Sequence, residues 1–300
     1  MRNKIFLILV FLLLCSSAFA QKRGFSMNYS YHVKKDGTAE IDTFLGSERV
    51  ITLPAILDEY VVTSVGVGCF ANSPLEEVTI PYDYTYIGEN AFKGSNSLRK
   101  IDLPEMLNSV GPSAFENCTA LSSISFPPVT YGIGEYALRG CTSLTKVILP
   151  PDLTEMGNGI FQNCTALVGV IIPESMLYIP DYTFCGMTSL RYVHMPDSVV
   201  SIGWSAFADC TSLATVVLPE YVSIIGPQAF ARCTSLNFVF LPESCIDIGA
   251  DIFSELTTVV AFAVKDSYAA QYLQQSKFKG VIFILERGEK MDEDFYFESG

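Results

Sequence analysis

Residues 213–235 read LATVVLPEYVSIIGPQAFARCTS, and Leu236 begins the same pattern again. In this stretch the apolar residues Val216 and Leu218 occupy alternate positions just before Pro219. Alternation with a period of two is typical of a short strand with one buried face, and proline ends such a strand because it has no N–H to donate. The stretch therefore predicts a short strand followed by a return path.

Prolines recur every 23 residues along most of the chain, each preceded by an apolar residue and, six positions earlier, by leucine. They are Pro81, Pro104, Pro127, Pro150, Pro173, Pro196, Pro219 and Pro242. A unit of this length cannot bury its own apolar face, so the units must stack, with neighbouring strands in parallel at ~4.8 Å. We therefore expect a solenoid of eight or nine turns over residues 64–263. A propeller needs blades of about 40 residues, which exceeds this period.

The second half of each repeat carries an Ala-Phe pair, as at Ala206-Phe207, with a cysteine three residues after the aromatic ring. The cysteines at this position are Cys118, Cys141, Cys164, Cys210 and Cys233, and Met187 stands in the missing place. We expect a ladder of free, buried thiols that act as small apolar groups. Parallel side chains do not suit the ~90° torsion of a disulfide. Cys69, Cys185 and Cys245 lie off this ladder, and the sequence predicts no pairing for them.

This pattern, L-x-x-I-x-I-P followed by I-G, A-F and C, resembles the leucine-rich repeats of BspA-like surface proteins over roughly residues 64–263. The resemblance implies a β-rich (α/β-type) leucine-rich-repeat solenoid with a parallel sheet face, an N-terminal β-hairpin cap and a C-terminal helical cap. Asp36-Gly37 supplies the turn dipeptide of the expected hairpin. The expected divisions are a signal peptide (1–20), an N-terminal β cap (21–63), the solenoid (64–263), a C-terminal cap (264–285) and an acidic flexible tail (286–300).

The first residues predict export. Arg2 and Lys4, an apolar run over residues 5–14 and an A-x-A site at 18–20 form a secretory signal peptide. The run is shorter than the ~20 residues that cross a bilayer, and no later stretch is longer and equally apolar, so no membrane insertion is expected. We expect a secreted or cell-surface protein.

Composition excludes several partners and chemistries. Without residues 1–20 the chain keeps 17 basic and 32 acidic residues, a net charge of −15 that repels nucleic acid and anionic lipid. His32 and His194 are the two histidines, and neither lies in a zinc-type spacing. We therefore predict no catalytic residues, no cofactor and no metal site, and expect a protein that is not an enzyme. A column of carboxylates, Glu174, Asp197, Glu220 and Glu243, is interpreted as solvated surface, with a Ca²⁺ site as the alternative.

The candidate binding surface lies at the outward strand positions, two and four residues before each proline. These positions are polar or charged in early repeats, as at Glu77, Lys100 and Ser123, and become apolar later. The apolar strip comprises Ile148, Ile171, Tyr192, His194, Val217, Phe238 and Phe240. A monomer rarely exposes such a strip without a partner. The alternative is that the C-terminal cap or a neighbouring loop covers part of it.

The resemblance implies adhesion or recognition at a cell surface, with a protein or a glycan as partner. Two alternatives remain at this point. A secreted carbohydrate-active hydrolase would need two converging carboxylates, and a purely structural spacer would need no binding surface.

Overall fold

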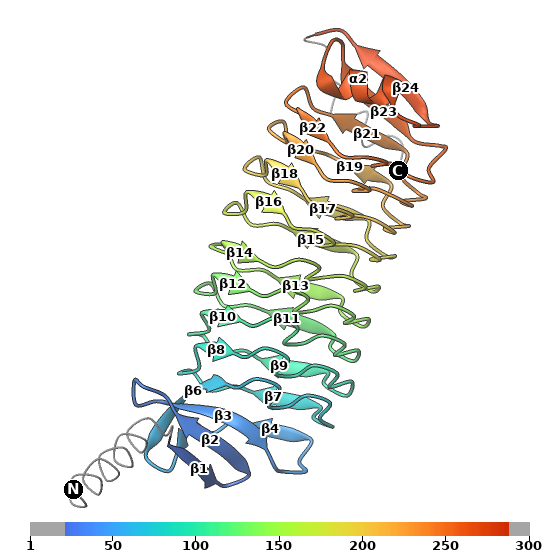
Figure 1. Cartoon of the computed structure of the whole chain (residues 1–300). Helices are drawn as coiled ribbons and strands as arrows, with labels where there is room; N and C mark the ends of the chain where they lie inside the picture. Colours follow the sequence, from blue (N-terminus) through green and yellow to red (C-terminus); the bar gives the residue numbers. More distant parts are fainter. Residues whose placement is uncertain (1–21, 288–300) are drawn as a thin grey trace, which may run out of the picture.

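The chain folds into an elongated solenoid with a cap at each end (Figure 1). The structure, a computed structural model, describes residues 22–287 and contains about 11 turns. The predicted solenoid is confirmed, and it is longer than the eight or nine turns expected for residues 64–263. The difference arises because the caps extend the stack, through β4 (Val50–Thr52) before the first repeat and β24 (Val281–Leu285) after the last.

One side of the solenoid, here called the strand face, is formed by the strands that precede the repeated prolines. Their alternate residues point inward, as in β7, where Val78 is buried between two more exposed neighbours. Between β4 and β24 these strands are β7 (Glu77–Thr79), β9 (Lys100–Asp102), β11 (Ser123–Ser125), β13 (Lys146–Ile148), β15 (Gly169–Ile171), β17 (Tyr192–His194), β19 (Thr215–Val216), β21 (Phe238–Leu241) and β23 (Val260–Val264).

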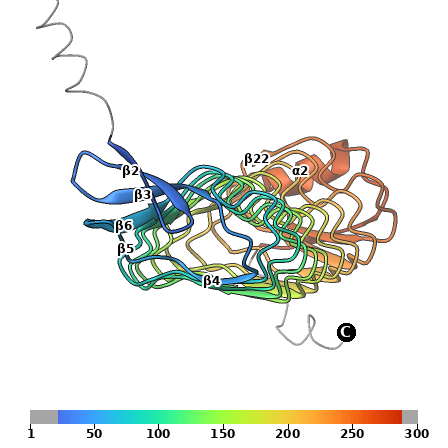
Figure 2. The same ribbon diagram turned by 90° about the horizontal axis from the view of Figure 1, so that it is seen from below.

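The opposite side, here called the second face, is formed by two-residue strands. Each of them lies just before the Ala-Phe segment of its repeat. Each pairs in parallel with a neighbouring turn, as Ser109 of one strand does with Gly132 of the next. The strands are β8 (Tyr86–Ile87), β10 (Ser109–Val110), β12 (Gly132–Ile133), β14 (Glu155–Met156), β16 (Tyr178–Ile179), β18 (Ser201–Ile202), β20 (Ile224–Ile225) and β22 (Asp247–Ile248). Seen along the axis, the two faces enclose a narrow core (Figure 2).

A third column of segments, here called the turn column, follows the second face and carries the Ala-Phe pairs. Its backbone bonds run through every turn, for example from Phe184 N–H to Ala206 O at 2.8 Å and from Phe207 N–H to Ala229 O at 2.8 Å. The phenyl rings stack in the core, with 4.9 Å between the centroids of Phe184 and Phe207. The buried rings stack in two runs, from Phe70 to Phe115 and from Phe161 to Phe253, because each turn places this side chain at the same point of the cross-section. Leu138 replaces the ring between the two runs.

The cysteine ladder is confirmed as a row of buried thiols, and all eight described cysteines are free. Each ladder thiol donates a hydrogen bond of 3.0–3.2 Å to a main-chain carbonyl of the preceding turn, as Cys210 Sγ does to Phe184 O. Ser95 makes the same bond from an earlier turn, with its hydroxyl 2.7 Å from Phe70 O. Burial raises the pKa of the Cys141 thiol to about 12. The ladder therefore joins turns through S–H donors that are held in the protonated form.

The N-terminal cap is a small sheet that covers the first turn. The expected hairpin consists of β2 (Tyr29–Val33) and β3 (Ala39–Phe44), joined through Gly37, whose φ of 85° suits glycine. Its other strands are β1 (Arg23–Ser26), β5 (Ile56–Leu57) and β6 (Tyr60–Val65). Strand β3 pairs with β6, and β6 with β8, so the cap continues directly into the second face.

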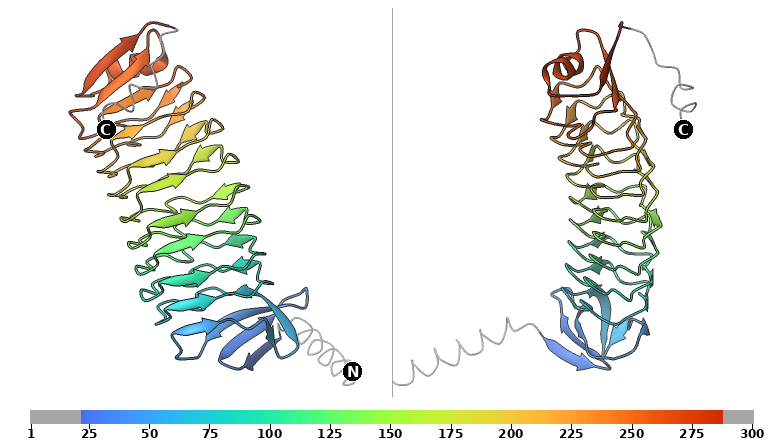
Figure 3. Two further views of the ribbon diagram at one scale, coloured as in Figure 1. Left: turned by 180° about the vertical axis from the view of Figure 1, so that it is seen from behind. Right: turned by 90° about the vertical axis from the view of Figure 1, so that its right-hand side faces the viewer.

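The C-terminal cap contains α2 (Tyr268–Gln275), which packs over the last turns. The helix begins later than residue 264, where the expected cap starts, because Val264 still belongs to β23. Ser267 caps it, its hydroxyl accepting from Ala270 N–H at 3.1 Å. Strand β24, which the sequence did not predict, then pairs with β23 and ends the strand face. Both caps are visible in two further views (Figure 3).

Two expectations concern the ends of the chain. The signal peptide over residues 1–20 and most of the acidic tail at 286–300 lie outside the described residues. Within residues 22–287, no helix has the length and apolar character that a membrane span requires.

Candidate functional site

The predicted apolar strip lies on the strand face, but its members differ in exposure. Ile171 is 69% exposed, Tyr192 58%, Val217 58% and Ile148 46%, and His194 is also exposed. These five residues therefore form an accessible surface over β13 to β19. Exposed aliphatic side chains on adjacent strands are uncommon on a monomer without a partner.

The C-terminal end of the strip is less exposed than its centre. Phe238 and Phe240 are half-buried, because β23 pairs beside β21 and sets Val260 against Phe238 and Phe262 against Phe240. The Phe262 ring in turn stacks on Phe283 of β24 at 5.3 Å. The C-terminal cap thus covers part of this end, which was the alternative that the sequence left open.

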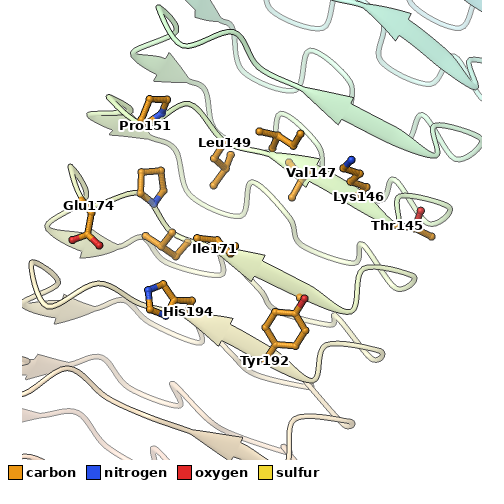
Figure 4. A pocket seen from close by; sticks show the side chains of 13 residues that line it. Thr145, Lys146, Val147, Leu149, Pro151, Ile171, Glu174, Tyr192 and His194 are labelled. Atoms are coloured by element: carbon orange, nitrogen blue, oxygen red, sulfur yellow. The ribbon is translucent and has the colours of Figure 1, made fainter.

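A groove of about 580 Å³ occupies the centre of the exposed strip. Ile148 and Lys146 of β13 line one side, and Ile171 of β15 with Tyr192 and His194 of β17 line the other (Figure 4). Of its lining residues only Glu174 is acidic. The groove is therefore apolar at its centre, with a cation and an anion among the residues around it.

Gly169 forms the floor of the groove beside Tyr192. A Cβ at this position would lie 2.1 Å from Cζ of Tyr192, which is closer than atoms can approach. The Tyr192 ring therefore lies directly over the Gly169 backbone. Because glycine leaves this space, the ring lies against the strand instead of standing away from it, and one face stays open to solvent.

The groove coincides with an interruption in both sheets. Strand β13 pairs with β11, and β15 with β17, but β13 and β15 belong to separate sheets. On the second face, β14 ends a nine-stranded sheet and β16 begins another. We call the interface between the turn of β13 and β14 and the turn of β15 and β16 the seam.

Pro180 explains the break on the second face. In the following turn the equivalent residue is Gly203, whose N–H donates to Ile179 O at 2.8 Å, and Gly157 bonds likewise to Ile133 O in the preceding turn. A proline cannot donate this bond. At the next interface the glycine position also has no room for a side chain, since a Cβ at Gly203 would lie 2.5 Å from Asp181 N. A proline ring therefore requires the turns to stand further apart at this point.

Met187 removes a second contact at the same interface. It occupies the ladder position and is fully buried, but its thioether has no proton to donate to the Phe161 carbonyl. The centroids of Phe161 and Phe184 are 6.1 Å apart across the seam, against 4.9 Å for Phe184 and Phe207 across the next interface. The core stack continues through the seam but is looser there.

The turn column holds the seam together. Gly159 N–H donates to Asp181 O at 2.8 Å, Phe161 N–H to Thr183 O at 3.1 Å, and Asn163 N–H to Cys185 O at 2.9 Å. One side-chain bond is added by Ser175, whose hydroxyl lies 2.6 Å from Leu153 O. Sequence reasoning did not identify the seam, although proline in the glycine position and methionine in the cysteine position of one repeat were visible signals.

The carboxylate column does not form a cation site in the described structure. Glu174, Asp197 and Glu220 are exposed, and Glu243 forms an ion pair with Arg287. Within residues 22–287, the one group of three His, Cys, Asp or Glu side chains with donor atoms within 4.8 Å of one another is His32, Glu40 and Asp42. The carboxylates of the column therefore do not converge on one point.

The repeat can now be compared with known proteins. A family model described as the BspA type leucine-rich repeat region, in 6 copies, matches residues 63–184 and 161–282. The chain belongs to the BspA-type leucine-rich-repeat family. Membership indicates a protein-interaction or recognition module, and the repeats of this family build non-catalytic binding scaffolds.

A solved structure shows the same fold. The chain is similar to a Treponema pallidum leucine-rich repeat protein, with 30% identity and a TM-score of 0.61 over 64% of this chain and 91% of that one. It also matches a leucine-rich cell surface protein of Faecalibacterium prausnitzii, with 21% identity and a TM-score of 0.43 over 91% and 97% of the two chains. No curated protein matches the sequence.

Proposed function

We propose that the protein is an exported recognition module that binds a protein partner at a cell surface, through the groove at the seam. The observation that carries this proposal is the row of exposed apolar side chains, Ile148, Ile171, Tyr192 and Val217, at and beside that groove. Export rests on the signal-peptide pattern of residues 1–20. Displayed at a cell surface, such a module would act in adhesion.

The chemistry of the groove favours a protein over a glycan. Three of the four side chains are aliphatic, and aliphatic surface is best buried against apolar side chains of a partner. A sugar site would present more hydrogen-bonding groups beside its aromatic ring. The groove also offers a hydrolase only Glu174, whereas glycoside hydrolysis uses two carboxyl groups on either side of the bond. A recognition surface therefore fits these residues better than an active site.

Tyr192 is the expected anchor of the interaction. Its ring is more than half exposed, rests on Gly169, and loses little conformational freedom on binding because the strand backbone holds it. Tyr192→Ala should weaken the partner complex by ~2 kcal/mol, roughly thirtyfold in Kd. Phe238, which belongs to the predicted strip, is half-buried beside the cap, so Phe238→Ala should reduce stability more than affinity.

The test begins with a screen of the purified protein against extracellular-matrix proteins and a glycan array, followed by calorimetry on the strongest binder. Tyr192→Ala and Ile171→Ala should each weaken binding, and Ser123→Ala on the polar part of the same face should not. A glycan as the strongest binder would replace the protein partner proposed here. Saturable protein binding that neither substitution weakens would contradict the proposed site. The absence of any binding would favour a structural spacer.

A further inference from the structure

A second cluster of chemically capable side chains lies at the other end of the molecule, on the N-terminal cap. Strands β2 and β3 pair so that His32 stands directly opposite Glu40. Their neighbours Tyr31 and Ile41 are buried against the core, while His32, Glu40 and Asp42 are half-buried. The three polar side chains thus gather on the side of the hairpin away from the core.

An irregularity in the hairpin places the Asp42 side chain beside His32. The register shifts between Ser30 and Tyr31, which pair with Thr43 and Ile41, so Asp42 is left without a partner of its own on β2. Such a β-bulge changes the direction of a side chain. Asp42 Oδ1 lies 2.6 Å from Nδ1 of His32, and donor atoms of all three residues lie within 4.8 Å of one another.

Among the described residues, the two carboxylates of this cluster are not held in ion pairs with lysine or arginine. In the described part of the chain, neither Glu40 nor Asp42 forms an ion pair with lysine or arginine. The Lys34 ammonium donates instead to the hydroxyls of Thr63 and Ser64, at 2.7 and 3.0 Å. Arg23 stands opposite His32 on β1, without an ion pair to either carboxylate.

Two neighbouring groups respond to these carboxylates. Burial raises the pKa of the Cys69 thiol, and the charges of Asp42 and Glu40 raise it further. Burial also raises the pKa of Tyr86, with a smaller contribution from Glu40. A hollow of about 470 Å³, lined in part by Arg23, Glu40 and Asp42, lies beside the cluster and leaves room for water. The hollow therefore gives solvent and ions access to the two carboxylates.

We propose that His32, Glu40 and Asp42 bind one Zn²⁺ ion on the outer side of the N-terminal cap. An imidazole nitrogen with two carboxylate oxygens is a donor set that Zn²⁺ accepts at ~2.0–2.2 Å, with a fourth position left for water. Ca²⁺ and Mg²⁺ prefer sites made of oxygen alone. Tetrahedral bonds of that length separate the donor atoms by about 3.3 Å, which side-chain rotation can reach from the observed positions.

Binding replaces the hydrogen bond between His32 and Asp42. The metal takes the Nδ1 lone pair, so a neutral imidazole must carry its proton on Nε2, and an imidazolium must release its Nδ1 proton to water. Asp42 Oδ1 then bonds the metal in place of the proton. The antiparallel pairing of β2 and β3 keeps the three side chains together before the ion arrives, which reduces the entropy lost on binding.

The sequence predicted no metal site because its two histidines lie in no metal-type spacing along the chain. His32 and Glu40 are eight residues apart and become neighbours only through the register of the hairpin. The site also lies at the opposite end of the solenoid from β24, well before the seam in the order of turns (Figure 1). The zinc proposal is therefore independent of the proposed recognition site.

The experiment is calorimetric titration of the purified protein, under reducing conditions, with ZnCl₂. We expect one ion per chain, and His32→Gln and Asp42→Asn should each weaken binding by about tenfold or more. Asp247→Asn is the matched control, because it removes an exposed carboxylate of β22 at the other end of the solenoid and should leave Zn²⁺ binding unchanged. Circular dichroism of each variant checks that the cap remains folded.

Thermal unfolding supplies a second readout. Zn²⁺ that binds the folded cap should raise the Tm of the protein and of Asp247→Asn, but not of His32→Gln. The proposal fails if no saturable binding appears at Zn²⁺ concentrations on the order of 0.1 mM. It also fails if His32→Gln and Asp42→Asn bind as tightly as the unchanged protein, since the ion would then be held elsewhere.

Discussion

The seam and the interface one turn later contain equivalent segments joined in different ways. At the later interface β15 pairs with β17 and β16 with β18, Gly203 donates to Ile179 O, and Cys210 donates to Phe184 O. At the seam the two strand pairings are absent, and Pro180 and Met187 replace the two donors. The turn column is continuous across both interfaces.

This difference shows that the turn column and the strand face have different roles within one repeat. The turn column and the ring stack are sufficient to keep neighbouring turns together, so the strand face is not required for cohesion at every interface. A solenoid's stability is approximately a sum of nearest-neighbour terms, and one weak interface can therefore be tolerated. The weak interface is also where the groove lies, with Gly169 and Tyr192 at its centre.

The largest expected effect concerns the ring stack. Phe207 is fully buried and stacks at 4.9 Å on Phe184 and 5.3 Å on Phe230, so Phe207→Ala should lower the free energy of unfolding by ~3–5 kcal/mol. Phe161→Ala, at the seam, should cost about 1 kcal/mol less because its ring has a more distant neighbour. Urea denaturation measures both. Equal losses would mean that the seam is packed as tightly as its neighbour.

Transferring the seam's proline to the next interface should have the second largest effect. Gly203→Pro removes the bond to Ile179 O and forces a ring against Asp181, and should destabilise the protein by ~2–4 kcal/mol. The matched change at the seam, Pro180→Ala, should stay within ~1 kcal/mol of the unchanged protein. Thermal melts of the two variants give the comparison. A neutral Gly203→Pro would show that close approach is not needed there.

A smaller effect is expected from the thiol ladder. Cys210→Ala leaves Phe184 O without its S–H donor and should cost ~1–2 kcal/mol in unfolding free energy. Cys210→Ser should be milder, because Ser95 already makes the equivalent bond. Thiol titration of the denatured, unreduced protein should find at least five free cysteines. Two or more disulfides within the ladder would contradict stacked thiols.

The strand face should show the smallest effect on stability. Tyr192→Ala and Ser123→Ala remove exposed side chains, and each should change the unfolding free energy by less than ~0.5 kcal/mol. Chemical denaturation checks this under the same conditions as Phe207→Ala. A loss of unfolding free energy above ~2 kcal/mol for Tyr192→Ala would show that its ring is part of the core.

The repeat period made the fold predictable, because leucine, proline and Ala-Phe each recur in one phase and so must occupy one position in every turn. It also predicted which strand residues point outward. The sequence left cover by the C-terminal cap open, but it could not tell that Phe238 and Phe240 are the covered residues, since this depends on how β23 and β24 add to β21. The cluster around His32 depends on a bulge at Asp42, which no local pattern marks.

Hydrogen exchange at two consecutive interfaces measures whether the turns are less tightly bonded at the seam. Arg191 and Val200 donate their N–H groups to Val168 O and Leu177 O, both at 2.8 Å, whereas in the described structure Val168 and Leu177 make no such bond to the turn before them. Val168 and Leu177 hold the positions of Arg191 and Val200 one repeat earlier. We therefore expect the amides of Val168 and Leu177 to exchange at least about tenfold faster than those of Arg191 and Val200. Equal protection of the two pairs would contradict the existence of the seam.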